Sequence, residues 1–288
     1  MIVRGLGVCA ALACALAPPA IAGPMRHGGK LLLTGGATGI EGSAGGGLAT
    51  WALIGGNETD AGIGLGAHAT EVMLDDYGFR SFGAKLGLFD RLELSVARQR
   101  FDTKAAGAAL GLGRGFTFGQ DIYGAKLRVA GDAVYDTLPQ IALGVQHKRA
   151  RRDAVIAAVG GARASGTDYL LSVSRIVLDR SLVLGATARA TRANQFGLLG
   201  FGGDRRTGYS VQFEGSAGAL VTRRLLVGAE LRTRPNNLRF AREDDAWDLF
   251  AAWTPQRNLT VTAAYVDLGS IAARPGQQGL YLSAQLGF

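Results

Sequence analysis

The sequence predicts an all-β fold, a closed antiparallel transmembrane β-barrel, and three observations support this fold class. Residues 279–288 alternate strictly, with Leu280, Leu282, Ala284, Leu286 and Phe288 on one face and polar or small residues on the other. Similar alternation recurs in segment after segment from Ala61 onward, and the chain begins with a segment resembling an export signal. Strands with one lipid-facing side must close into a barrel, because an open edge would leave backbone groups unpaired in hydrocarbon.

Residues 1–22 are predicted to be a secretory signal peptide. Arg4 provides a basic start, residues 6–17 are apolar, and residues 20–22 form a small-x-small cleavage site. Cys9 and Cys14 both lie in this segment, so an exported chain would carry no disulfide, thiolate nucleophile or cysteine metal site. The alternative is a lipoprotein acylated at Cys14, which is disfavoured because Ala11 stands where such signals usually carry leucine.

Residues 23–57 are rich in glycine and have no clear period. One interpretation pairs residues 30–41 with residues 48–55 as a first hairpin, which gives a barrel of 14 strands. The other places the whole segment in the lumen as a plug and leaves 12 strands. Both give the even number that bacterial barrels require, and the 14-strand barrel is the preferred prediction.

Residues 58–288 are predicted to form the barrel proper. Apolar residues alternate with polar or small ones in twelve successive stretches: residues 63–70, 82–88, 92–99, 123–129, 141–148, 169–178, 182–191, 209–219, 225–232, 247–253, 259–265 and 279–288. Within residues 169–178, Arg175 falls in register with the apolar residues Tyr169 and Leu171. A β-bulge is expected there, because one extra residue would return Arg175 to the polar face.

The lengths of the connections orient the barrel. Short connections at residues 57–60, 89–91, 179–180, 222–224 and 255–258 alternate with long ones at residues 102–120, 149–166, 193–207, 234–244 and 268–278. Barrels of the bacterial outer membrane have short periplasmic turns and long outer loops, so the sequence predicts the cell outer membrane, with Phe288 on the periplasmic side. Trp247, Trp253, Tyr265 and Tyr123 lie on the apolar face, where aromatic girdles are found.

Ten charged residues fall on the predicted lumen face, six basic and four acidic: Lys85, Glu93, Lys126, Arg128, Lys148, Arg189, Glu214, Glu230, Arg232 and Asp248. In an open pore such residues set ion selectivity, and the excess of basic groups favours anions slightly. In a filled barrel the same charges pair with one another. The second interpretation is favoured because ten charges of both signs can largely neutralise each other.

Catalysis and cofactor binding find little support. The three histidines, His27, His68 and His147, stand in no G-x-S-x-G, H-x-x-x-H or similar context, and no dinucleotide-binding loop is present. We therefore expect no enzyme activity, no cofactor and no metal, with an outer-membrane hydrolase as a remote alternative.

The net charge of +8 does not indicate nucleic-acid binding, because the basic residues are scattered. Arg149, Arg151 and Arg152 in one long connection and Arg205 and Arg206 in another are predicted to meet lipopolysaccharide phosphates. Simple solvation of these loop charges is the alternative. The other expected partners are membrane lipid, small solutes and, through the terminal aromatic Phe288, the barrel assembly machinery.

The long connection at residues 193–207 is unusually apolar. Phe196, Leu198, Leu199 and Phe201 are too apolar to remain exposed in water. We expect this connection to fold into the barrel mouth as a constriction, or to contact a partner.

Five segments carry a family resemblance: residues 28–36 (GGKLLLTGG), 95–101 (SVARQRF), 190–205 (ATRANQFGLLGFGGDR), 241–245 (AREDD) and 264–269 (AYVDLG). Together they resemble the proteobacterial domain of unknown function 3034. The resemblance implies an outer-membrane barrel but brings no substrate or catalytic residue. The predicted function is a channel for small solutes, and the alternative is a non-conducting structural or assembly barrel with interacting loops.

Overall fold

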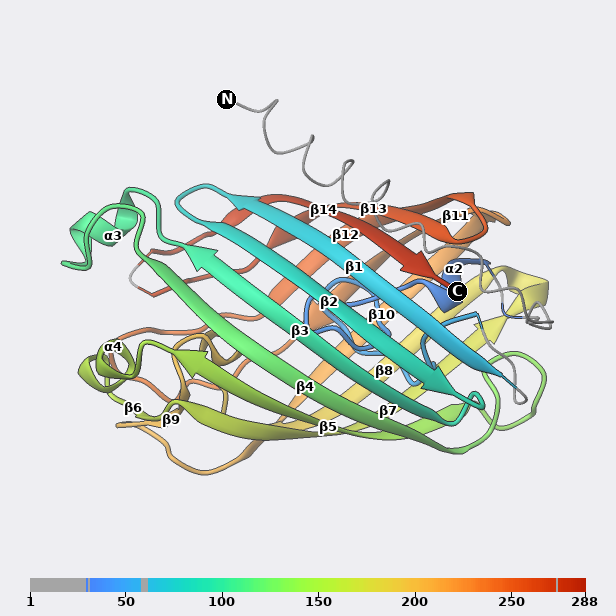
Figure 1. The fold of residues 1–288 in the computed structure, drawn as a ribbon, viewed down its shortest axis with the longest axis horizontal. Helices are drawn as coiled ribbons and strands as arrows, with labels where there is room; N and C mark the ends of the chain where they lie inside the picture. The colour runs from blue at the N-terminus through green and yellow to red at the C-terminus, as the bar shows by residue number, and fades with distance from the viewer. Residues whose placement is uncertain (1–29, 31, 58–61, 273) are drawn as a thin grey trace.

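Twelve strands follow one another around a closed antiparallel barrel in the computed structural model, which describes residues 30, 32–57, 62–272 and 274–288 (Figure 1). The strands are β1 (Ile63–Leu74), β2 (Gly78–Leu88), β3 (Leu92–Asp102), β4 (Thr117–Ala130), β5 (Gln140–Arg151), β7 (Ser165–Val177), β8 (Leu182–Thr191), β10 (Ser210–Thr222), β11 (Leu225–Arg232), β12 (Ala246–Gln256), β13 (Leu259–Asp267) and β14 (Gln278–Gly287). The predicted signal peptide, residues 1–22, lies outside the described residues.

The last strand closes the barrel against the first. β14 pairs with β1 from Gly66 opposite Gly287 to Leu74 opposite Gly279. Phe288 continues this pairing, since its backbone N–H donates to Leu65 O at 2.8 Å and its carbonyl accepts from Leu65 N–H at 3.0 Å. The closed all-β fold and the C-terminal strand predicted from the alternation are therefore confirmed.

The preferred count of 14 strands is wrong, and the alternative of 12 strands with an N-terminal plug is correct. After the short helix α2 (Leu32–Gly35), residues 36–57 contain no strand, only an isolated bridge between Gly45 and Thr50. The segment runs inside the barrel (Figure 1). Its glycines disfavour extended pairing, and Gly42 at φ +91° adopts a conformation that favours glycine.

The expected bulge at Arg175 is also absent, because β7 pairs with β5 and β8 without a shift in register. Arg175 stays in register with the outward-facing Tyr169, and its guanidinium donates to the carbonyl of Asp136 in the connection between β4 and β5. A basic side chain is tolerated on the apolar face there because it lies near the strand end, where a long side chain reaches polar groups.

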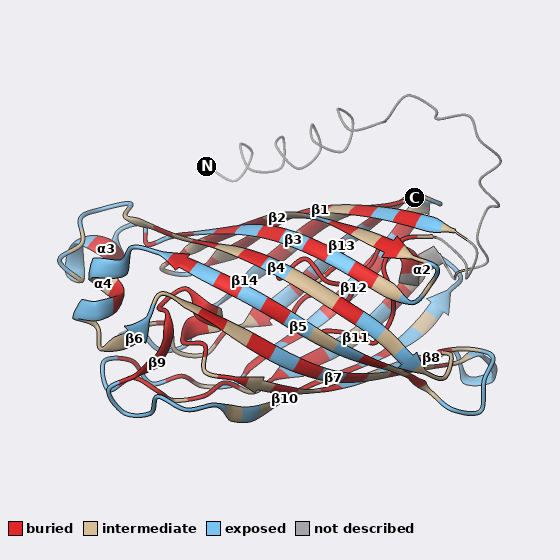
Figure 2. Cartoon of the chain, turned by 60° about the horizontal axis from the view of Figure 1, so that its bottom comes forward, coloured by how far each residue is buried: buried red, intermediate tan, exposed pale blue. Residues whose placement is uncertain are grey.

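The two faces of the barrel wall differ as the alternation predicts. Outward side chains are apolar and exposed, for example Leu143, Leu171 and Leu249, whereas the inward side chains are mostly buried (Figure 2). Trp247 and Tyr265 face outward with ring centroids 5.8 Å apart. This outer surface suits hydrocarbon, with aromatic rings near a strand end.

The two ends of the barrel also differ. At the turn end, the strands are joined by residues 89–91, 131–139, 178–181, 223–224 and 257–258, and the described chain ends at Phe288. At the loop end, most connections are longer and carry α3 (Ala106–Ala109), α4 (Asp153–Ala158), η2 (Gln195–Gly197) and a small sheet of β6 (Gly161–Arg163) and β9 (Phe201–Gly203). In the part of the chain that the structure describes, no helix is long and apolar enough to cross a membrane.

Candidate functional site in the barrel lumen

The lumen is occupied by a loop of the chain itself. Gly56 N–H donates to Gly35 O at 2.8 Å, so the chain enters and leaves the barrel at one neck. Next to this neck, Asn57 N–H donates to Phe288 O at 3.0 Å, which places it at the turn end. We call residues 36–55, between the two glycines of the neck, the plug.

Carboxyl groups of the barrel wall bind the backbone N–H groups of the plug. Glu230 Oε2 accepts from Gly47, Leu48 and Ala49 at 2.7, 2.7 and 3.2 Å. Glu214 Oε2 accepts from Thr50 N–H at 2.7 Å. The plug contains no regular secondary structure beyond one bridge, so these side chains replace the partners that a helix or sheet would provide.

A third carboxyl group spans two parts of the plug. Glu93 accepts from Ala44 N–H at 3.1 Å through one oxygen and from Gly55 N–H at 2.7 Å through the other. Ser43 Oγ also donates to Glu93 at 2.5 Å, and Lys126 pairs with the same carboxyl at 3.2 Å. The two limbs of the plug are thus tied to one residue of β3.

Donors of the wall bind the plug carbonyls in turn. Lys85 Nζ donates to Ala37 O at 2.5 Å, and Lys126 Nζ donates to Trp51 O at 3.0 Å. Gln99 Nε2 donates to Ile40 O at 2.8 Å. The plug is therefore held mainly by polar contacts with strands on several sides of the barrel.

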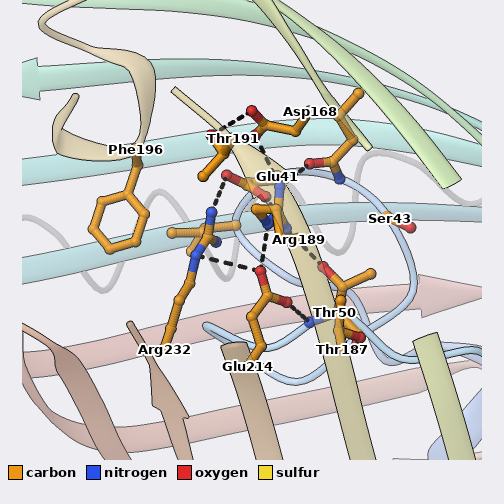
Figure 3. A network of polar contacts seen from close by, with 12 residues as sticks. Glu41, Ser43, Thr50, Asp168, Thr187, Arg189, Thr191, Phe196, Glu214 and Arg232 are labelled. Atoms are coloured by element: carbon orange, nitrogen blue, oxygen red, sulfur yellow. Dashed lines mark hydrogen bonds and ion pairs between the residues drawn. The ribbon is translucent and has the colours of Figure 1, made fainter. Parts of the chain in front are cut away.

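A buried ion cluster lies inside the barrel (Figure 3). Glu41 of the plug pairs with Arg189 and Arg232, each at 2.9 Å, and with Lys148. Arg189 also contacts Glu214 at 2.5 Å and Asp168 at 3.0 Å, while Lys148 contacts Asp168 at 2.9 Å. Three cations and three anions neutralise one another here, which burial of charge requires.

The structure brings nine of the ten predicted lumen residues into the barrel interior as buried side chains: Lys85, Glu93, Lys126, Lys148, Arg189, Glu214, Glu230, Arg232 and Asp248. Arg128 instead lies at the turn end, where it pairs with Asp90 and Asp132. Whether any of these residues lines a conducting pathway stays a prediction.

Two members of the cluster were not predicted. Glu41 belongs to the glycine-rich segment, whose lack of a period hides its burial. Asp168 follows the alternation, because it precedes the outward-facing Tyr169, but the uncertain register around Arg175 obscured that signal. With both included and Arg128 at the turn end, the interior set changes from six basic and four acidic residues to five basic and six acidic. The slight anion preference expected from the sequence loses its basis.

The apolar connection with Phe196, Leu198, Leu199 and Phe201 folds into the loop end of the barrel. The Phe196 carbonyl accepts from Gln120 at 3.2 Å, and the guanidinium groups of Arg232 and Arg234 lie 4.7 and 5.2 Å from its ring centroid. Leu198, Leu199 and Phe201 are buried. That this connection acts as a constriction or a partner surface stays a prediction.

Glu243, in the connection between β11 and β12, fastens this segment. Both of its carboxyl oxygens accept from Gln195 N–H at 3.0 Å, and Arg234 lies 4.0 Å away. Burial raises the pKa of Glu243 to about 7, against the opposing effect of Arg234 and the Gln195 N–H.

His68 and Ser81 form a base and hydroxyl pair inside the barrel, with Nε2 and Oγ 3.1 Å apart. Ser81 Oγ, however, also donates to Ile40 O of the plug at 2.7 Å, and His68 Nδ1 has no hydrogen-bond partner among the described residues. A nucleophilic site needs a third group to orient the base, and the described residues supply none here. The described residues also include no group of three or more metal-ligating His, Cys, Asp or Glu side chains.

The barrel has the fold of outer-membrane porins. It superposes on the KdgM porin with a TM-score of 0.51 and 10% sequence identity, over 77% of this chain and 99% of the porin. The model of the family described as protein of unknown function (DUF3034) matches residues 34–285, so the chain belongs to that family, as its sequence resemblance predicted.

Two further solved structures are similar at lower scores. The NanC porin has a TM-score of 0.47 and 9% identity over 78% of this chain and 98% of that one. The Acinetobacter baumannii outer membrane protein Omp33 has a TM-score of 0.45 and 10% identity over 80% and 100%. A comparison with curated proteins finds no match. At such identities the likeness concerns the fold alone.

Replacing Glu230 by Ala should loosen the plug, because three plug N–H groups lose one acceptor. A hydrogen bond to a charged group contributes about 1.5–3 kcal/mol, so amide exchange at Gly47, Leu48 and Ala49 should accelerate about tenfold or more. Hydrogen–deuterium exchange of the reconstituted protein measures this. Glu71→Ala, which removes a carboxyl paired with Arg80 away from the plug, is the matched control. Equal exchange in the two variants would contradict the anchoring role of Glu230.

Proposed function

We propose that the protein is an outer-membrane channel for small solutes whose passage is closed by its own plug and opens when the plug is displaced. The observation that carries this proposal is that the plug fills the lumen through hydrogen bonds and ion pairs with a polar wall. The loop end faces the outside of the cell and the turn end faces the periplasm, in line with short periplasmic turns in bacterial barrels.

The width of the barrel supports a channel. A barrel of about eight strands is just filled by its own side chains, whereas wider barrels enclose a lumen or a plug. Twelve strands exceed the side-chain-filled size, and here the central space is taken by residues 36–55. Removal of the plug would leave a space that the wall side chains do not fill.

The chemistry of the plug contacts also supports movement. Each hydrogen bond that Glu93, Glu214 or Glu230 accepts from the plug can be replaced by one with water, so displacement exposes charged and polar groups to water, not to hydrocarbon. The net contribution of such a bond to a charged group is about 1.5–3 kcal/mol, and the plug makes several of them. The closed state should therefore dominate until a solute or partner favours the open one.

The second candidate function is a non-conducting barrel whose loops are its working surface. The ion cluster around Glu41 favours it, because this cluster joins the plug to β5, β8 and β11 of the barrel wall. Removing one partner of a buried ion pair costs about 3–5 kcal/mol, so such a cluster resists opening. The two functions differ in whether the lumen conducts once the plug is gone.

Deleting residues 36–55 and joining Gly35 directly to Gly56 tests the proposal. The two glycines are already hydrogen-bonded at 2.8 Å, so the join requires little movement. We expect a steady ohmic conductance in planar bilayers, against a mostly closed state for the full chain. The barrel fold is checked by the mobility shift between unheated and heated samples on gel electrophoresis.

If the deletion prevents folding, the double variant Glu93→Ala and Glu230→Ala retains the plug but removes two of its anchors. It should show frequent transient openings, whereas Glu71→Ala should behave as the unmodified chain. A correctly folded deletion variant with no conductance would reject the channel and favour the non-conducting barrel.

We propose that lipopolysaccharide phosphates bind a patch of arginines at the loop end, which includes Arg149 and Arg151 of the contact predicted from the sequence. Five exposed arginines face outward on β2, β3 and β5: Arg80, Arg98, Arg100, Arg149 and Arg151. The pairing of β2 with β3, of β3 with β4, and of β4 with β5 brings them side by side. Asp121 pairs with Arg98 and Arg151, but Arg100 and Arg149 make no ion pair with the described residues. Phosphate groups suit such an arginine-rich surface.

The double variant Arg100→Ala and Arg149→Ala should lower the amount of lipopolysaccharide that copurifies with the protein from outer membranes several-fold. Its matched control is Arg180→Ala with Arg223→Ala, which removes two exposed arginines at the turn end. Lipopolysaccharide is quantified per barrel by phosphate analysis. An equal loss in the control, or no loss in the patch variant, would reject the patch as a phosphate site.

A further inference from the structure

A cavity of about 420 Å³ lies between the plug and the loop-end connections. Among its lining residues, Ile40 and Leu48 belong to the plug, while Phe79, Phe101 and Phe118 belong to the wall strands. Ligand pockets commonly have volumes of about 300 to 1,000 Å³. The cavity is thus large enough for a small organic molecule, and the plug forms part of its surface.

The loop end is organised around this cavity. Each of the six loop-end connections contributes at least one described residue to its lining. One residue from each connection, in chain order, is Tyr77, Leu110, Val155, Phe196, Phe240 and Ile271. These residues are apolar in all six connections, so the space that the loops surround has an apolar surface on every side. A shared apolar surface that stays unfilled indicates a binding site.

Three of the four polar side chains of the lining, all but Tyr281, are turned to other partners. Thr103 Oγ1 donates to Phe116 O at 2.8 Å, and Tyr77 OH donates to Ile271 O at 3.3 Å. Gln195 Nε2 donates to Ser270 O at 3.4 Å. The Tyr281 hydroxyl is buried and has no hydrogen-bond partner among the described residues, and its ring lies next to Gly47 of the plug. It is an uncharged group. An ionised ligand would find no counter-charge among these lining residues.

An apolar cavity of this size is costly to leave empty. Its lining atoms lack contacts on one side, and apolar cavities exclude water but accept apolar molecules of fitting size. Three charged groups lie close to Phe196: Arg232 and Arg234 over its ring and Lys148 at its carbonyl, and each of the three also lies beside a carboxyl group. A carboxylate ligand would therefore have to break existing ion pairs, whereas an uncharged one would not.

We propose that this cavity binds an uncharged apolar small molecule, of the class of aromatic or short aliphatic hydrocarbons, on its way through the barrel. The inference rests on the proposed channel and names its solute class. The ligand would touch Ile40 and Leu48 directly, so its binding is coupled to the plug by contact. Entry is from the loop end, where Ala154 and Ala158 of α4 and Phe240 line the cavity and are also exposed.

Binding of radiolabelled naphthalene to the full chain in lipid nanodiscs, measured by equilibrium dialysis, tests the inference. Ala158→Trp and Ala154→Trp place an indole in the cavity from an exposed helix, so they should fold normally. Ala157→Trp adds the same side chain at a neighbouring exposed position that does not line the cavity. We expect saturable binding of one naphthalene per barrel, lowered at least tenfold by the first two variants and unchanged by the third.

Two results would overturn the inference: naphthalene uptake no greater in the unmodified chain than in Ala158→Trp, or equal binding of benzoate, whose ring carries a charge. The assay uses the closed barrel and requires no conduction. If the full chain binds naphthalene saturably but the variant lacking residues 36–55 does not conduct, the channel is rejected and the apolar binding site is kept. Conductance without naphthalene binding would keep the channel and reject this solute class.

Discussion

The requirement that every backbone polar group away from water has a hydrogen-bond partner governs both layers of this molecule. In the wall, the backbone N–H and C=O groups of twelve strands pair with those of neighbouring strands. The pairing of β14 with β1 closes the sheet, so no strand edge is left unpaired. In the lumen the plug has no such regular partners, so Glu93, Glu214 and Glu230 accept its N–H groups while Lys85 and Lys126 bind its carbonyls. These five wall side chains, predicted from the sequence to face the lumen, are partners of the plug.

The interior of the barrel also changes in character along the barrel axis, from polar around the plug to apolar near the loops. Around Glu41 the interior is polar and charge-balanced, and its contacts with the plug can be exchanged for water. Toward the loop end the interior becomes apolar, and a cavity bounded by Ile40 and Leu48 separates the plug from the loops. In the proposed channel, an apolar solute would bind in this cavity first and would pass through the barrel once the plug is displaced.

Much of the barrel could be predicted because lipid on one side and a packed interior on the other impose a two-residue period. That period identified all twelve strands and the burial of residues such as Lys148 and Arg189. It failed where no such asymmetry exists. The plug is surrounded by protein on all sides, so the sequence around Glu41 shows no two-residue period. Arg175 faces outward near a strand end, and a basic residue in an apolar register was mistaken for a sign of a bulge. The cavity depends on the convergence of distant connections, which no local pattern records.

The most direct test of a movable plug is a disulfide between Gly36→Cys and Thr260→Cys. A Cβ built at Gly36 lies 3.9 Å from Thr260 Cβ, which suits a disulfide, and the two native cysteines, Cys9 and Cys14, lie in the predicted signal peptide. Planar-bilayer conductance is recorded from the same reconstituted protein before and after reduction. A gated channel predicts no openings while the bond is intact and openings after reduction. Equal openings in both states, or none in either, would contradict a plug that leaves the lumen.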